Sequence, residues 1–192
     1  MKSSEKLEIL RNIASEGENG ARKFLENYGL EGKFPVNIIE LIERVGIRII
    51  PYDFSQMEKS EEYANKVIQK GKILGAVAVN ECNIGIFVDQ TCHTKELQLA
   101  LAHEFAYCCL CAKASSHRSH VDFRSDILGE KTVPLKTDIF AECLLMPKKD
   151  VEYVHSTLTV PYISSFAKIF GVPENVACSR LKRLGLNYYT ST

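Results

Sequence analysis

Two adjacent ionisable residues in an apolar segment carry the clearest chemical signal of this sequence. His103 and Glu104 lie in LALAHEFAYCCL, residues 99–110, and open the pattern H-E-x-x-H. On a helix, residues four positions apart share a face, so two histidines at this spacing can bind one Zn²⁺, and the glutamate can serve as general base for a metal-bound water. The second histidine position holds Tyr107. A neutral phenol is a poor zinc ligand, so the pattern is incomplete.

Other residues could rebuild a metal site around His103. Cys108 follows five positions later, which places it about 140° away around the helix at about 100° per residue. Several potential ligands lie instead in the polar segment 115–133, which reads as an irregular connection that could fold back. These residues are His117, His120, Asp122 and Glu130.

Tyr107 also has a purely structural interpretation. Its ring would fill the space of the missing histidine and metal, and its hydroxyl would bond to Glu104 or Asp138, because a buried tyrosine hydroxyl usually finds a partner. The cysteines that follow it are expected to be small buried packing residues, since C-C-x-C on one helix lacks the paired spacing of a structural zinc site. They are Cys108, Cys109 and Cys111.

Periodicity and turn residues indicate which elements position these side chains. A helix is predicted for residues 95–113, after a β-hairpin that turns at NECN, residues 80–83. A second helix, 136–146, is stopped by Pro147. The other predictions are a helix over 5–28 that Gly17 and Gly20 could split, a helix near 35–46, a strand near 47–54 in which Pro51 favours an edge position, a loop or exposed helix over 55–71, and two short helices near 160–186.

The composition indicates a globular protein without a strong overall electrostatic field. Of the 192 residues, 45% are hydrophobic and 25% charged, and the formal net charge is zero, which disfavours disorder and gives no global attraction to nucleic acid. We expect no signal peptide and no membrane-spanning segment. Seven cysteines without disulfide-framework spacing favour a reducing cytoplasm.

Four segments together resemble one protein family. They are PVNIIELIERVGIRII, similar to its N-terminal helix and strand; LALAHEFAYCCL, similar to its A-H-E-L-G-H helix; TDIFAECLLMP, similar to its E-x-E-A-N/D-x-F-A-x-x-L-L-M-P element; and ISSFAKIFGVPENVACSRLKRLGL, similar to its C-terminal helices. Over roughly residues 35–186, the chain thus resembles the ImmA/IrrE family of zinc metallopeptidase-like proteins. The L-L-M-P element is the most specific part of the match.

The resemblance implies roles for individual positions. His103 matches the first zinc ligand and Glu104 the catalytic glutamate, while Tyr107 stands where the second ligand belongs. The glutamate that binds metal in the family falls at Pro134, so that ligand is also missing. Asp138 matches an Asn/Asp position that could orient His103 by a hydrogen bond. Zinc is therefore implied by the resemblance, but we expect that it is not bound stoichiometrically.

The resemblance also implies an architecture. We expect an α+β fold, a helix-rich zincin-like metallopeptidase with a small β-sheet, in which the A-H-E helix packs against the L-L-M-P helix. Residues 1–157 would form the metallopeptidase-like domain with its N-terminal helix. Residues 158–192 would form a C-terminal helical segment that resembles a helix-turn-helix.

Three functional hypotheses follow. The first is a catalytically impaired regulator that binds a protein partner, and the family, often encoded on phage or mobile elements, points to a helix-turn-helix repressor. The second is an active zinc peptidase with non-standard ligands that cleaves such a repressor. The third is a DNA-binding regulator whose C-terminal helices touch phosphate, which neutral net charge disfavours. The basic residues of that segment are Arg180, Lys182 and Arg183.

Overall fold

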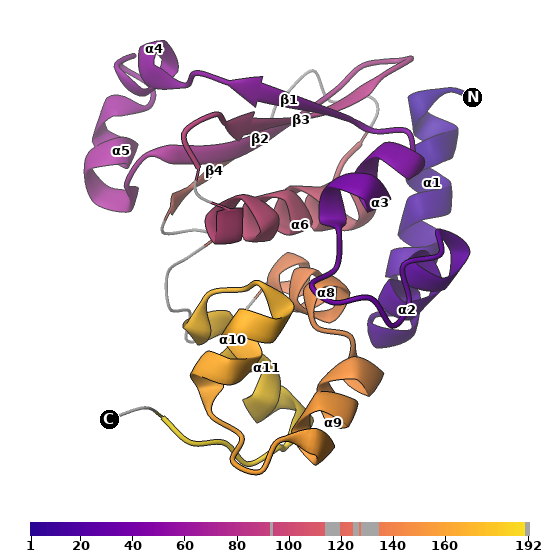
Figure 1. The fold of residues 1–192 in the computed structure, drawn as a ribbon. Coiled ribbons are helices and arrows are strands. Elements are labelled where there is room, and N and C mark those ends of the chain that lie inside the picture. Colours follow the sequence, from indigo (N-terminus) through magenta and orange to yellow (C-terminus); the bar gives the residue numbers. More distant parts are fainter. Residues whose placement is uncertain (93, 114–119, 125–126, 128–134, 191–192) are drawn as a thin grey trace.

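The protein consists of a small sheet packed on a helical body (Figure 1). This computed structural model describes residues 1–92, 94–113, 120–124, 127 and 135–190. The predicted helix-rich α+β class is confirmed. The elements are α1 (Ser3–Ala14), α2 (Glu18–Asn27), α3 (Ile38–Arg44), β1 (Arg48–Tyr52), α4 (Ser55–Glu58), α5 (Ala64–Lys70), β2 (Ile73–Val79), β3 (Ile84–Asp89), α6 (Thr94–Leu110), β4 (His120–Phe123), α8 (Lys136–Leu145), α9 (Lys148–Thr157), α10 (Ile163–Phe170) and α11 (Glu174–Leu184).

The sheet has four strands in the order β1-β3-β2-β4. The predicted hairpin is confirmed as the antiparallel pair β2 and β3, and Pro51 lies in the edge strand β1, which runs parallel to β3. The prediction of an irregular connection over 115–133 was wrong for residues 120–123, which form β4 antiparallel to β2. A four-residue strand among polar residues has too little periodicity to be recognised, and its formation depends on the free edge of β2.

Two other local features differ from or extend the sequence predictions. The N-terminal helical region is indeed two helices, because Gly17 adopts a positive φ of 62° between α1 and α2. The segment near 148–156, for which no helix was predicted, forms α9. Its apolar residues Val151 and Val154 are three positions apart and buried, so its inner face is short and easily missed.

Helix α6 runs through the centre of the molecule, with the sheet on one side and α8 on the other (Figure 1). Its residues 99–106 are all buried, which explains why this segment shows no polar face. Phe24 of α2 contacts both Phe105 of α6 and Phe140 of α8 edge to face, with ring centroids 5.4 and 6.1 Å apart. The predicted packing of the A-H-E helix against the L-L-M-P helix is confirmed.

The C-terminal helices α10 and α11 join at Gly171, which adopts the left-handed conformation after α10, and Pro173, which precedes α11. Buried side chains on both sides of residues 157 and 158 belong to one hydrophobic core. The predicted domain boundary at this point stays a prediction. Within the described ranges, no helix has the length and apolar character needed to cross a membrane.

Candidate functional site

His103 is a buried imidazole held between two carboxylates from different elements. Its side chain projects from α6 and is 4% exposed. Nδ1 lies 3.0 Å from Oδ2 of Asp122 on β4, and Nε2 lies 3.0 Å from Oδ1 of Asp138 on α8. Thr137 of α8 also approaches Nε2, with its hydroxyl oxygen 3.2 Å away. The ring is therefore fixed from the sheet side and from the α8 side.

Asp138 serves two structural purposes at once. Its Oδ2 accepts a hydrogen bond from the backbone N–H of Leu135 at 2.7 Å, which satisfies a free donor where α8 begins. Its Oδ1 faces His103. Helix α8 starts at Lys136. The position expected to carry the third zinc ligand, Pro134, lies outside the described residues.

Asp122 connects His103 to a second histidine. Its Oδ2 lies 3.0 Å from Nδ1 of His103 and 3.0 Å from Nε2 of His120, two residues earlier on β4. Of the four residues that could rebuild a metal site, Asp122 thus contacts His103 directly, and His120 is connected to it through Asp122. The other two, His117 and Glu130, lie outside the part of the chain that the structure describes.

Tyr107 lies against β4. Its ring stacks on the His120 ring, with centroids 3.7 Å apart and an interplanar angle of 4°. Of the two partners predicted for its hydroxyl, Glu104 is ruled out, because neither oxygen of that carboxylate has a hydrogen-bond partner among the described residues. The bond to Asp138 stays a prediction. Tyr107 therefore occupies the second-ligand position as a packing partner of His120.

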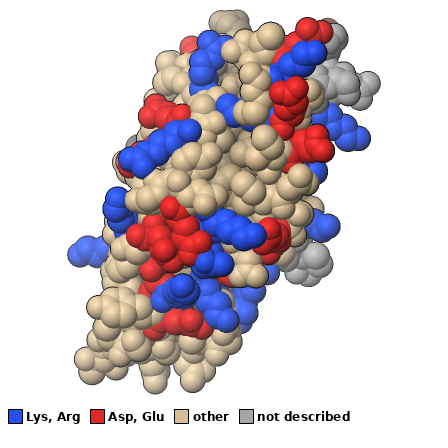
Figure 2. Space-filling model, turned by 90° about the vertical axis from the view of Figure 1, so that its right-hand side faces the viewer, with Lys and Arg blue, Asp and Glu red and all other residues tan. Residues whose placement is uncertain are grey.

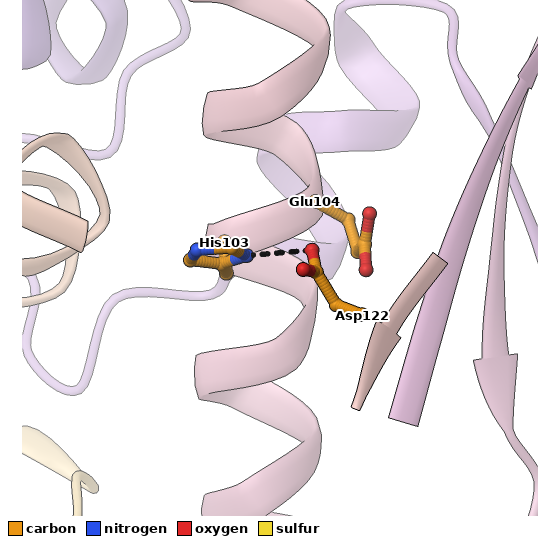
Figure 3. Close-up of side chains that lie close together, drawn as sticks. All are labelled: His103, Glu104 and Asp122. Carbon is orange, nitrogen blue, oxygen red and sulfur yellow. Dashed lines mark ion pairs between the residues drawn. The ribbon is translucent and has the colours of Figure 1, made fainter. Parts of the chain in front are cut away.

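Glu104 is a fully buried carboxylate without a hydrogen-bond donor. It is 0% exposed, and its carboxylate points toward Asp122 (Figure 3). It lies over the backbone of Gly75 on β2, the residue paired with Asp122 in the sheet. A Cβ atom at Gly75 would come 2.3 Å from Oε1 of Glu104. The absence of a side chain at Gly75 thus provides the space that the carboxylate occupies.

Burial and charge shift the three ionisable groups in different directions. Burial alone would lower the pKa of His103, but its contacts with Asp122 and Asp138 and their negative charges raise it to about 9. Burial would raise the pKa of Asp122, yet His103 and His120 hold it below its usual range. Burial, followed by the negative charge of Asp122, raises the pKa of Glu104 well above its ordinary value. Without another cation, the site is a buried imidazolium between two carboxylates, next to a glutamate whose burial opposes its ionisation.

The cysteines of α6 have no place in this cluster. Cys108 and Cys109 are buried, as predicted, and burial raises the pKa of both thiols well above the ordinary value. Cys111 is exposed, so its prediction as a buried packing residue was wrong. It directly follows the last residue of α6, and its neighbour Ala112 belongs to the core instead.

The two-histidine zinc arrangement is not built by the described residues. Helix α6 supplies one imidazole, Tyr107 stacks on β4, and Nε2 of His103 is already engaged by Asp138 and Thr137. A different group of possible metal ligands comes together instead: His103, Glu104 and Asp122 have ligand atoms that all lie within 4.8 Å of one another. Sequence reasoning named Asp122 as a possible ligand but not the role of Gly75 or Thr137, for which it offers no local signal.

Most of the chain matches the model of a known protein family. The profile of the IrrE N-terminal-like domain, a peptidase family, matches residues 42–182, which is most of the chain and includes α6, β4 and α8. A search of curated proteins found no match.

Proposed function

Since this chain belongs to the family of IrrE N-terminal-like domains, we propose that it is a metallopeptidase-like regulator that does not hydrolyse peptides and acts by binding a protein partner. The observation that carries the proposal is the state of position 107. Tyr107 stacks on His120 where the family pattern requires a second imidazole. A single helix imidazole cannot create the open, three-ligand zinc site on which this class of hydrolysis depends.

The position of Glu104 also supports the loss of hydrolysis. A general base must lie within hydrogen-bonding distance of the water that it deprotonates. Glu104 is 0% exposed and points into the space between α6 and the sheet, toward Asp122. In this arrangement its carboxylate has no access to a water that could attack a bound peptide.

The partner is proposed by family analogy. ImmA/IrrE proteins act on helix-turn-helix repressors, and we propose a repressor of this type as the partner, with a phage or mobile element as the setting. None of the seven cysteines forms a disulfide, which supports a reducing compartment such as the cytoplasm.

We predict that the full-length chain does not cleave protein substrates. With unfolded casein and with purified helix-turn-helix repressors from the same genome as substrates, and with Zn²⁺ supplied, cleavage should equal that of Glu104→Gln, which lacks the base. Gel and mass-spectrometric detection of fragments measures this. Zinc-dependent cleavage that disappears in Glu104→Gln would show that the protein is an active peptidase. Failure of every repressor to bind in biolayer interferometry would contradict the partner proposal.

One observation favours an active peptidase as the second candidate. Asp122 lies 3.0 Å from His103, and His120 lies 3.0 Å from Asp122, so non-standard ligands are available near the family's metal position. The cleavage assay decides between the two candidates, because only an active peptidase would depend on Glu104.

The third hypothesis, DNA binding by the C-terminal helices, loses most of its support. Arg180 is buried, so it is not available to contact phosphate, and Arg183 forms an ion pair with Glu142 at 3.1 Å. Lys182 is exposed, and no acidic side chain among the described residues forms an ion pair with it. On the face shown in Figure 2, basic and acidic side chains are interspersed, and no extended basic patch is visible.

A further inference from the structure

The cluster of His103, Glu104 and Asp122 contains buried polar atoms that lack hydrogen-bond partners. Neither oxygen of Glu104 has a hydrogen-bond partner among the described residues. Nδ1 of His103 faces Oδ2 of Asp122 at 3.0 Å. Buried polar atoms in native proteins are nearly always satisfied, and an unsatisfied group often indicates an ion or water that belongs there. These atoms all face one point, the carboxylate of Asp122 (Figure 3).

We propose that His103, Glu104 and Asp122 form a divalent-cation site between α6 and β4, with a ligand set different from the two-histidine arrangement. This proposal replaces the expectation, drawn from the resemblance, that zinc is not bound stoichiometrically. Each residue offers one ligand atom, and these atoms lie within 4.8 Å of one another. Two ligands bound to one metal at about 2.1 Å are about 3.0–3.5 Å apart, in keeping with the 3.0 Å between Nδ1 and Oδ2. Small movements of the Glu104 side chain would complete the site.

The surrounding residues prepare the site for a cation. Asp138 and Thr137 engage Nε2 of His103, which leaves Nδ1 to face Asp122 and Glu104. A carboxylate on the far nitrogen is the usual way in which proteins orient a metal-binding histidine. Gly75 provides the space that holds the Glu104 carboxylate beside Asp122. His120 Nε2, 3.0 Å from Oδ2 of Asp122, is a further nitrogen donor at the edge of the cluster.

The donor types select the class of ion. One imidazole and two carboxylates suit a transition-metal dication such as Mn²⁺ or Zn²⁺. Mg²⁺ and Ca²⁺ prefer oxygen ligands alone and should bind far more weakly. Because Glu104 would be a ligand here, it could not act as general base, so the ion would join α6 to the edge strand β4 and would not support hydrolysis.

The test is metal binding to the full-length chain after treatment with EDTA. Isothermal titration should give one Mn²⁺ or Zn²⁺ per chain, and Mg²⁺ should give no comparable binding. At about 100 times the Kd, the metal should raise the Tm by about 5–10 °C. Co²⁺ should give visible absorption bands of a nitrogen- and oxygen-ligated ion. This last measurement needs no variant and therefore does not depend on a variant that folds.

Two substitutions and a matched control locate the ion. Glu104→Gln and Asp122→Asn keep the side-chain shapes and should each weaken binding by at least about 10-fold. Asp89→Asn is the control, because Asp89 is also a buried aspartate but pairs with Lys72 at the end of β3. It should leave the Kd unchanged.

Three results would overturn the site: no transition-metal binding, binding that is equal in Glu104→Gln and the parent, or binding that Asp89→Asn weakens as much as Asp122→Asn does. The peptidase assay is a separate readout. Metal binding without cleavage supports both proposals. Cleavage by a chain with the ion bound to these residues would overturn the proposed function and leave the cation site intact.

Discussion

Replacing Arg180 by methionine is expected to lower the free energy of unfolding by about 3 kcal/mol. Arg180 lies on α11 and is 0% exposed. Its guanidinium donates hydrogen bonds to the backbone oxygen of Met146 at 2.8 Å and to Oε1 of Glu18 at 2.6 Å. Removing one partner of a buried ion pair usually costs about 3–5 kcal/mol. The lower value applies here, because Glu18 is partly exposed and water can hydrate its carboxylate once Arg180 is gone.

The effect should depend on pH in a defined direction. Burial would raise the pKa of Glu18, but the hydrogen bond and charge of Arg180 outweigh it and lower the pKa below 4.5. The pair therefore contributes its full stability above the unfolded pKa of Glu18 and loses it as the pH falls through the lowered folded value. The difference between parent and Arg180→Met should accordingly be largest near neutral pH and shrink in acid.

Urea unfolding followed by circular dichroism measures this prediction, with Lys182→Met as control. Lys182 lies on the same helix and is exposed, so its substitution should change stability by no more than about 0.5 kcal/mol. Equal, small effects of the two substitutions would mean that Arg180 is not part of the core, and the DNA-binding hypothesis would regain support.

The second large effect is expected at Gly75, where alanine should destabilise the protein by about 2 kcal/mol. Glycine to alanine within a strand ordinarily stabilises, since glycine has the greater freedom in the unfolded chain. Here the new Cβ would lie 2.3 Å from Oε1 and 2.9 Å from Cδ of Glu104. The Glu104 carboxylate, which is fully buried, would have to move away from Asp122.

Gly85→Ala provides the matched control for Gly75→Ala. Gly85 is also buried in the sheet, but its added Cβ would meet only side-chain carbons of Phe87 and Ile50, at 3.4 and 3.5 Å. The free energy of unfolding of Gly85→Ala should therefore differ little from that of the parent. Combining Gly75→Ala with Glu104→Ala should cost less than the sum of the two single substitutions, because the clash disappears. Strict additivity would show that Glu104 does not lie over Gly75.

The local elements of this protein are strongly encoded. Glycine at 171 and proline at 173 mark the end of one helix and the start of the next, and the two apolar runs around residues 80–83 predict the hairpin. Such signals act over a few residues and need no tertiary context. No such local signal marks β4. This strand of four residues depends on hydrogen bonds to β2, which lies far away in the sequence.

For the site, the sequence by itself determined which groups are available: His103 and Glu104 are present on one helix, and Tyr107 replaces the second histidine. It also indicated the family, since the L-L-M-P element follows at the expected distance. Which groups meet was decided only by the tertiary structure. Asp122 reaches His103 because β4 pairs with β2, and Glu104 is buried without a partner because Gly75 leaves space beneath it. These contacts join residues distant in sequence, so no local pattern could reveal them.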